Sequence, residues 1–141
     1  VDEAREAMKK ILIIDDDPDI VEAMKMVLEA QDFEVHSALN GTEGLSRVKQ
    51  MHPDLIILDV MMDQLTEGFQ VSYTLKNAAP GSEYGPFAKI PILMVTAVGK
   101  EMHMKFSPET DGAYLPVEAF LEKPVQPKML IEKVKALLAT A

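Results

Sequence analysis

Three consecutive carboxylates, Asp15, Asp16 and Asp17, follow directly after the apolar run 11–14. Two carboxylates ~4 Å apart repel each other by roughly 4 kcal/mol at an effective dielectric constant near 20. A positively charged partner must offset that cost, and carboxylate oxygens are the ligands that Mg²⁺ prefers. The pattern therefore predicts a divalent cation site at the end of the first strand.

Three further strand-like segments each lead into a polar residue. These residues are Asp59, Thr96 and Lys123. A carboxylate can attack a phosphoryl group and form an acyl phosphate. Because the transferred group needs mainly positioning and charge neutralisation, a cation and hydrogen-bond donors would complete such a site. We interpret Asp59 as the nucleophile, Lys123 as a point charge for a phosphoryl oxygen and Thr96 as a hydrogen-bond partner.

The three consecutive carboxylates have different expected roles. Asp16 is expected to contact the cation directly together with Asp59, whereas Asp15 would act through water. Asp17 stands just before Pro18 and is expected to cap the following helix. Each of these polar residues alone has an ordinary structural explanation. Their occurrence at four successive strand ends favours a phosphoryl site.

Strand-like and helix-like segments alternate along the chain, which predicts an α/β fold with a parallel sheet. The expected strands are 10–14, 33–36, a segment opened by Pro53, 92–95 and 120–122. The expected helices run from Pro18 to about Ala30, over a segment with Leu45 and Val48 that follows residues 40–42, over about 67–77, and from Pro127 onward. In doubly wound sheets, ligands bind beyond the carboxyl ends of the strands, so the polar residues should converge there.

Two stretches depart from this alternation. Residues 78–91 contain a Pro/Gly-rich loop. Residues 106–117 contain Pro108, Gly112 and Pro116, which make a long fourth helix improbable. We therefore expect the fourth helix region to be irregular.

Length, charge and cysteine content limit the function classes. The chain has 141 residues, enough for one domain with a full core. Its formal net charge of −9 argues against direct nucleic acid binding. Cysteine is absent, which suits a reducing cytoplasm, and no apolar stretch reaches the ~18 residues that a membrane span needs. We predict a cytoplasmic protein without nucleic acid or membrane contacts.

Four segments, 11–18, 54–62, 95–97 and 121–124, resemble the receiver domain of bacterial two-component response regulators. The resemblance covers about residues 9–138. It implies an α/β, doubly wound five-stranded parallel sheet of the flavodoxin-like type, with strand order 2-1-3-4-5 and helices on both faces. It also suggests that residues 1–8 are an N-terminal extension and that 9–141 form the receiver domain.

The resemblance implies roles for individual residues. Asp59 would be the phosphoacceptor. The Mg²⁺ ligands would be Asp15, Asp16, Asp59 and the backbone carbonyl of Met61. The phosphoryl group would be bound by Thr96, the backbone of Ala97 and Lys123, with Pro124 in a cis peptide bond. Thr96 and Phe120 would form the conformational switch.

The family also implies partners. A sensor histidine kinase or a histidine phosphotransfer protein would supply the phosphoryl group. The face made of the fourth helix region, the fifth strand and the last helix would carry the output and could form a homodimer. Catalysis would be limited to the domain's own phosphorylation and dephosphorylation. The dephosphorylation should be slow, because Met61 and Val98 are apolar where a polar side chain could orient water.

Two other functions remain as alternatives, and both fit the residues less well. An aspartyl-phosphate hydrolase needs a second Asp two residues after the nucleophile, and position 61 is Met. A flavin-binding module needs a phosphate cradle after the first strand, where the three carboxylates would repel a phosphate. The sequence leaves open whether the chain is a stand-alone receiver or part of a larger protein.

Overall fold

A five-stranded parallel sheet forms the centre of the protein. The computed structural model describes residues 8–59, 65–96, 119–122 and 124–140. The strands are β1 (Lys10–Ile14), β2 (Glu34–Ala38), β3 (Leu55–Asp59), β4 (Ile92–Thr96) and β5 (Ala119–Glu122). They lie in the order β2-β1-β3-β4-β5, and every pair is parallel. This confirms the predicted strand order 2-1-3-4-5.

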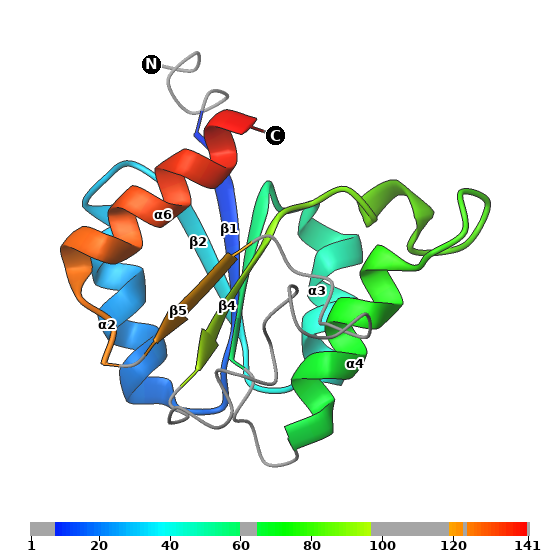
Figure 1. Cartoon of the computed structure of the whole chain (residues 1–141), viewed down its shortest axis with the longest axis horizontal. Coiled ribbons are helices and arrows are strands. Elements are labelled where there is room, and N and C mark those ends of the chain that lie inside the picture. The colour runs from blue at the N-terminus through cyan, green and yellow to red at the C-terminus, as the bar shows by residue number, and fades with distance from the viewer. Residues whose placement is uncertain (1–7, 60–64, 97–118, 123, 141) are drawn as a thin grey trace, which may run out of the picture.

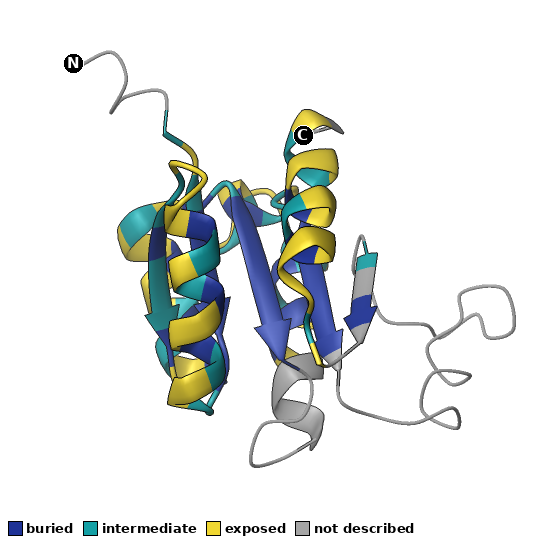
Figure 2. Cartoon of the chain, turned by 90° about the vertical axis from the view of Figure 1, so that its left-hand side faces the viewer, coloured by how far each residue is buried: buried dark blue, intermediate teal, exposed yellow. Residues whose placement is uncertain are grey.

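Helices cover both faces of the sheet, as predicted. They are α2 (Pro18–Glu29), α3 (Gly41–Met51), α4 (Leu65–Lys76), α6 (Pro127–Thr140) and the short 3₁₀ helix η1 (Gly85–Phe87). In Figure 1, α2 and α6 lie on one side of the sheet, and α3 and α4 lie on the other. Figure 2 shows the strand arrowheads pointing to one edge, so the carboxyl ends of the strands share that edge.

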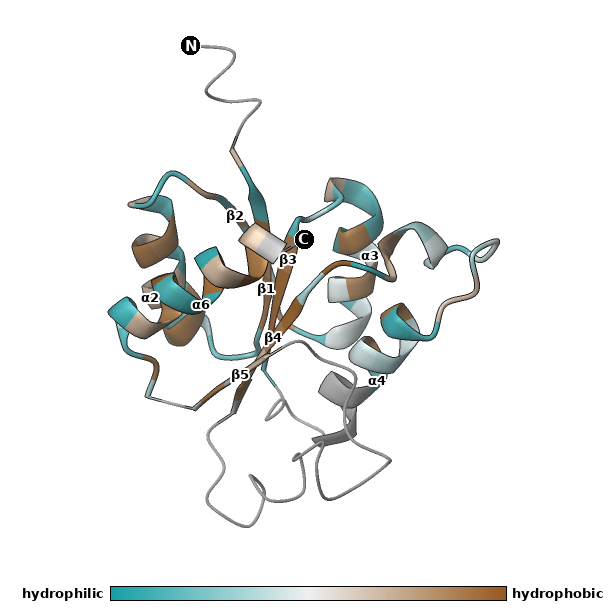
Figure 3. Cartoon of the chain, turned by 45° about the horizontal axis from the view of Figure 1, so that its top comes forward, coloured by the Kyte–Doolittle hydropathy of each residue, from teal (hydrophilic) through white to brown (hydrophobic). Residues whose placement is uncertain are grey.

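The core consists of the strands and the helix faces that pack on them. Residues 11–14, 55–58 and 92–95 are buried, and Figures 2 and 3 show the central strands in the colours of buried and hydrophobic residues. Strands covered on both faces must be apolar on both faces, which explains their uninterrupted hydrophobic runs. Ile11 and Ile13 belong to the core cluster on the side of α2 and α6, whereas Leu12 and Ile14 belong to the cluster on the side of α3 and α4.

The start of α2 agrees with the sequence prediction, and the start of β2 does not. Asp17 is the N-cap and Pro18 the first helical residue, an arrangement that suits proline because its missing N–H is not needed there. The second strand begins at Glu34 and runs to Ala38 rather than over 33–36. Its pairing with β1 continues to the end of that strand, where Ile14 lies opposite Ala38.

The predicted Pro/Gly-rich loop between α4 and β4 is ordered by packing. Its 3₁₀ helix contributes Phe87, which is buried in the core. The ring centroids of Phe87 and His52 lie 5.1 Å apart. Lys76 at the end of α4 donates a 2.6 Å hydrogen bond from Nζ to the carbonyl oxygen of Ile90. The loop therefore packs against the C-cap of α3 through Phe87, and the hydrogen bond of Lys76 joins the residues before and after the loop. The second irregular stretch, 106–117, lies outside the described residues.

None of the helices in the described part of the chain combines the length and the apolar character needed to cross a membrane.

Candidate functional site

Strand register brings two acidic residues together at the carboxyl edge of the sheet. Ile14 of β1 pairs with Leu58 of β3, and the next residues along the two strands are Asp15 and Asp59. Asp16 follows in the turn that leads to α2. Carboxylate oxygens of Asp15, Asp16 and Asp59 all lie within 4.8 Å of one another. The structure thus confirms that the predicted acidic residues of the first and third strands converge.

The environment of these three residues (the acidic site) suits a hard divalent cation. Asp15 is 1 % exposed and Asp59 is 2 % exposed, while Asp16 is half-buried. Buried carboxylates in mutual contact repel one another more strongly than exposed ones, because water screens them less. An all-oxygen, anionic donor set at a partly open edge is the ligand chemistry that Mg²⁺ accepts, with water completing its coordination. The residues present therefore fit the predicted cation.

Asp15 is held in place by its neighbours. Its backbone N–H donates to the carbonyl oxygen of Ala38 in β2 at 3.1 Å. Its side-chain Oδ1 accepts a 2.9 Å hydrogen bond from the backbone N–H of Asp17. The sequence predicted Asp17 as a helix cap, and the structure confirms that role, with its Oδ1 accepting from the N–H groups of Asp19 and Ile20. The hydrogen bond from the Asp17 N–H to the Asp15 carboxylate was not predicted, because the sequence alone does not show which donor a carboxylate faces.

Two further predicted residues lie on neighbouring strands. Thr96 is the last residue of β4, and the residue before it, Val95, pairs with Asp59. The backbone of Thr96 is therefore at the same edge of the sheet as Asp59. Phe120 lies within β5 opposite Met94. The side chains of Thr96 and Phe120 fall outside what the structure describes, so their proposed switch stays a prediction.

Three of the remaining predicted site residues are not placed. Met61, Ala97 and Lys123 lie outside the described residues. Pro124 is described and exposed, but its peptide bond with Lys123 is not, so the cis bond remains a prediction. Glu122, which pairs with Thr96 in β5, shows that the chain reaches this edge immediately before Lys123.

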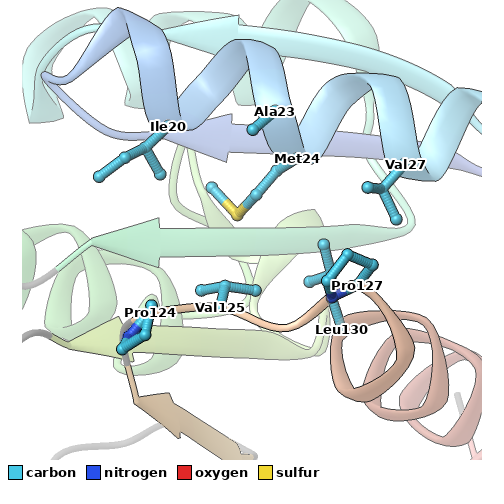
Figure 4. Close-up of a pocket in the computed structure, with 8 residues that line it drawn as sticks. All are labelled: Ile20, Ala23, Met24, Val27, Pro124, Val125, Pro127 and Leu130. Atoms are coloured by element: carbon cyan, nitrogen blue, oxygen red, sulfur yellow. The ribbon is translucent and has the colours of Figure 1, made fainter.

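An apolar pocket of about 480 Å³ lies between α2 and the segment that leads into α6. Figure 4 shows Ile20, Met24 and Val27 of α2 on one wall, and Pro124, Val125 and Leu130 on the other. All its lining residues are apolar. The side chains that line the pocket therefore offer no group that could bind a metal ion or move a proton, in contrast to the carboxylates of the acidic site.

Comparisons with known proteins show which family the chain belongs to. The family model described as "Response regulator receiver domain" matches residues 11–135. The DNA-binding dual master transcriptional regulator RpaA of Synechocystis is 34% identical over 131 residues, covering 93% of this chain and 49% of that protein. The alkaline phosphatase synthesis transcriptional regulatory protein PhoP of Bacillus subtilis is 33% identical, covering 92% and 48%. The chain thus spans about half the length of these relatives.

Solved structures show the same fold. A putative response regulator from Chloroflexus aurantiacus is similar with a TM-score of 0.76 and 29% identity, covering 94% of this chain and 98% of that one. The signal receiver domain of a signal transduction histidine kinase from Syntrophus aciditrophicus has a TM-score of 0.77 and 27% identity, covering 94% and 92%. The fold, the gathered carboxylates and the family match together show that this chain belongs to the response regulator receiver domains of two-component systems.

Proposed function

We propose that the chain is the phosphoacceptor domain of a phosphorelay and that Asp59 receives the phosphoryl group. The observation that supports this most directly is the acidic site, in which Asp59 ends a buried strand beside Asp15 and Asp16. A nucleophile in that position is fixed by the sheet, and little motion is needed to present its oxygen to a phosphoryl donor.

The reaction is a transfer between two side chains. An oxygen of the Asp59 carboxylate forms a bond to phosphorus while the bond from phosphorus to the imidazole nitrogen of a donor histidine breaks. The products are an acyl phosphate on Asp59 and a free histidine. Asp15, Asp16, Asp59 and the backbone carbonyl of Met61 would hold Mg²⁺, which when bound neutralises charge on the transferred oxygens.

Residues at the neighbouring strand ends would bind the transferred group. Thr96 would donate its hydroxyl hydrogen and Ala97 its backbone N–H, and Lys123 would supply a positive charge. The position of Thr96 at the end of β4, next to the strand of Asp59, supports its part in this arrangement. Movement of Thr96 and Phe120 would then convey phosphorylation to the face that contains β5 and α6.

The partners follow from the same proposal. A sensor histidine kinase or a histidine phosphotransfer protein would donate the phosphoryl group, and the domain would work in the cytoplasm. Residues 9–141 would form the receiver domain after an N-terminal extension over 1–8. The face made of the fourth helix region, β5 and α6 would contact a downstream partner or a second copy of the chain.

The test uses a small phosphodonor. The protein is incubated with acetyl phosphate, with Mg²⁺ and with EDTA, and the added phosphoryl group is detected by intact mass spectrometry. We expect modification of the wild-type protein only with Mg²⁺, and no modification of Asp59→Asn. Asp54→Asn is the matched control because Asp54 immediately precedes the same strand, at the end away from Asp59, and its Oδ2 accepts from the N–H of Lys10.

Two results would contradict the proposal. One is a wild-type protein that stays unmodified at saturating Mg²⁺ and acetyl phosphate. The other is an Asp59→Asn variant that is modified as fast as the Asp54→Asn control. Either result would mean that the acidic site does not accept phosphoryl groups.

A further inference from the structure

Hydrogen bonds of Asp17 hold the turn between β1 and α2 on both sides. The Oδ1 atom of Asp17 accepts from the N–H of Asp19 at 2.9 Å and from that of Ile20 at 3.4 Å. The backbone N–H of the same residue donates to Oδ1 of Asp15 at 2.9 Å. One residue is therefore bonded both to the first turn of the helix and to a carboxylate of the acidic site.

This second bond limits how Asp15 can turn. Asp15 is buried, and its own N–H is fixed to Ala38 of β2. With one side-chain oxygen bonded to the Asp17 N–H, rotation about the bond between Cβ and Cγ would break that bond. The direction of the Asp15 carboxylate thus depends on where the Asp17 amide points, and that depends on the helix cap.

Asp16 is held by the same arrangement. Its backbone connects Asp15, which is anchored to β2, with Asp17, which is anchored to α2. Rotation of the peptide unit between Asp16 and Asp17 would move the Asp17 N–H away from Asp15. A turn fixed at both ends keeps the oxygens of Asp15 and Asp16 within reach of Asp59.

We propose that Asp17 is a positioning residue for the metal ligands. The side-chain oxygen of Asp17 caps α2. This cap keeps the Asp17 N–H bonded to Asp15, so that the carboxylates of the acidic site are held in position before a cation binds. Asp17 would act as a hydrogen-bond acceptor, and its negative charge would be of secondary importance. This inference rests on the proposed function, because it concerns Mg²⁺ binding at the acidic site.

Substitutions of Asp17 separate the acceptor from the charge. Asn and Ser keep a side-chain oxygen that caps helices well, and both remove the charge. Ala removes the oxygen as well. If the acceptor positions the ligands, Asp17→Asn and Asp17→Ser should behave like the wild-type protein, and Asp17→Ala should not. Should Asp17→Ala fail to fold, Asp17→Gly replaces it, since glycine lacks the oxygen but is tolerated at an N-cap.

A second capped helix supplies the matched control. Asn40 caps α3, and its Oδ1 accepts a 2.8 Å hydrogen bond from the N–H of Glu43. Asn40→Ala should therefore lower the melting temperature about as much as Asp17→Ala, because each variant loses one helix cap. Asn40 has no such bond to a carboxylate of the acidic site among the described contacts.

The experiment measures the dissociation constant of Mg²⁺ by isothermal titration calorimetry, with Mn²⁺ as a second probe. Loss of groups that orient metal ligands weakens binding by about 10–100-fold. We expect Asp17→Ala to bind Mg²⁺ about tenfold more weakly than the wild-type protein, at the low end of that range. Asp17→Asn, Asp17→Ser and Asn40→Ala should stay within about threefold, which is below that range.

Each contrary result has a separate meaning. Asp17→Ala binding as tightly as the wild-type protein would overturn the inference, and so would equal weakening by Asn40→Ala. Asp17→Asn as weak as Asp17→Ala would show that the charge acts instead of the acceptor, which also overturns it. These three results leave the proposed function intact, whereas a wild-type protein that binds no Mg²⁺ would overturn the proposed function together with the inference.

Discussion

Gly44 of α3 lies directly against Ile14, the last residue of β1. A Cβ atom added to Gly44 would lie 2.5 Å from Cδ1 and 2.9 Å from Cγ1 of Ile14. Ile14 is fully buried and immediately precedes Asp15. The contact therefore sets how closely α3 packs on the strand that ends in the acidic site.

Gly44→Ala should destabilise the protein through this contact. Overpacking of a core typically costs about 1–3 kcal/mol, and the better helix propensity of alanine offsets up to about 1 kcal/mol. We expect a net loss of about 1–2 kcal/mol in the free energy of unfolding, measured with urea. Ile14→Val removes the nearest atom, so the double variant should lose less than the sum of the single changes. Strict additivity would count against a direct clash.

Two glycines of the loop between α4 and β4 should respond differently to alanine. A Cβ at Gly85 would lie 2.5 Å from the carbonyl oxygen of Pro80 and 2.6 Å from that of Ala79, whereas nothing lies within 4 Å of one at Gly81. Backbone atoms cannot rotate aside, so Gly85→Ala should cost about 2–3 kcal/mol. Gly81→Ala should change stability by less than about 1 kcal/mol. Thermal unfolding of both variants checks this, and equal melting temperatures would refute it.

Removing the Asp59 charge should stabilise the protein when no cation is present. Carboxylates at most 4.8 Å apart repel by at least about 3 kcal/mol for each pair at an effective dielectric constant of 20. We expect Asp59→Asn in EDTA to gain about 1–3 kcal/mol in unfolding free energy. With Mg²⁺, the wild-type protein should gain stability with cation concentration, and the variant should gain less. Asp54→Asn controls for loss of an acidic residue just before the same strand, and a less stable Asp59→Asn in EDTA would contradict the expectation.

The ion pair between Lys49 and Glu83 should persist to alkaline pH. The hydrogen bond that Lys49 donates to the Glu83 carboxylate raises the pKa of the exposed Lys49 ammonium above its ordinary 10.5. Because the folded state then holds this proton more tightly than the unfolded state, the stabilisation is complete below the unfolded pKa and is lost as pH rises through the folded pKa. The difference in unfolding free energy between wild type and Lys49→Met should be constant up to about pH 10 and shrink above it. If the difference in unfolding free energy stays unchanged well above about pH 10, the ion pair between Lys49 and Glu83 is not its cause.

The acyl phosphate on Asp59 should be long-lived, because the apolar Met61 cannot orient an attacking water molecule. We expect Met61→Asn to release phosphate several-fold faster than the wild-type protein after removal of the phosphodonor. The measurement is the decay of the phosphorylated mass with time. Met26→Asn is the control, since Met26 is 64 % exposed on α2, and an unchanged decay in Met61→Asn would contradict the expectation.

Much of the fold could be predicted from hydrophobic patterning. The runs 11–14, 55–58 and 92–95 are apolar at every position because both faces of the sheet are covered. Their alternation with helix-like segments indicated a parallel sheet. Asp17 and Pro18 indicated the start of α2 because their side chains suit those positions locally. The bounds of the second strand were predicted wrongly as 33–36, whereas β2 runs over Glu34–Ala38. The extent of this strand depends on its pairing with β1 rather than on its own residues.

The sequence by itself determined which residues could do the chemistry, because residue type and position after a strand are local properties. The tertiary structure decided how they meet. The pairing of Ile14 with Leu58 brings Asp15 beside Asp59 across residues distant in sequence. The direction of the Asp17 amide toward Asp15 likewise depends on how α2 leaves the sheet. Such contacts arise from strand register and helix packing, which local sequence preferences do not specify.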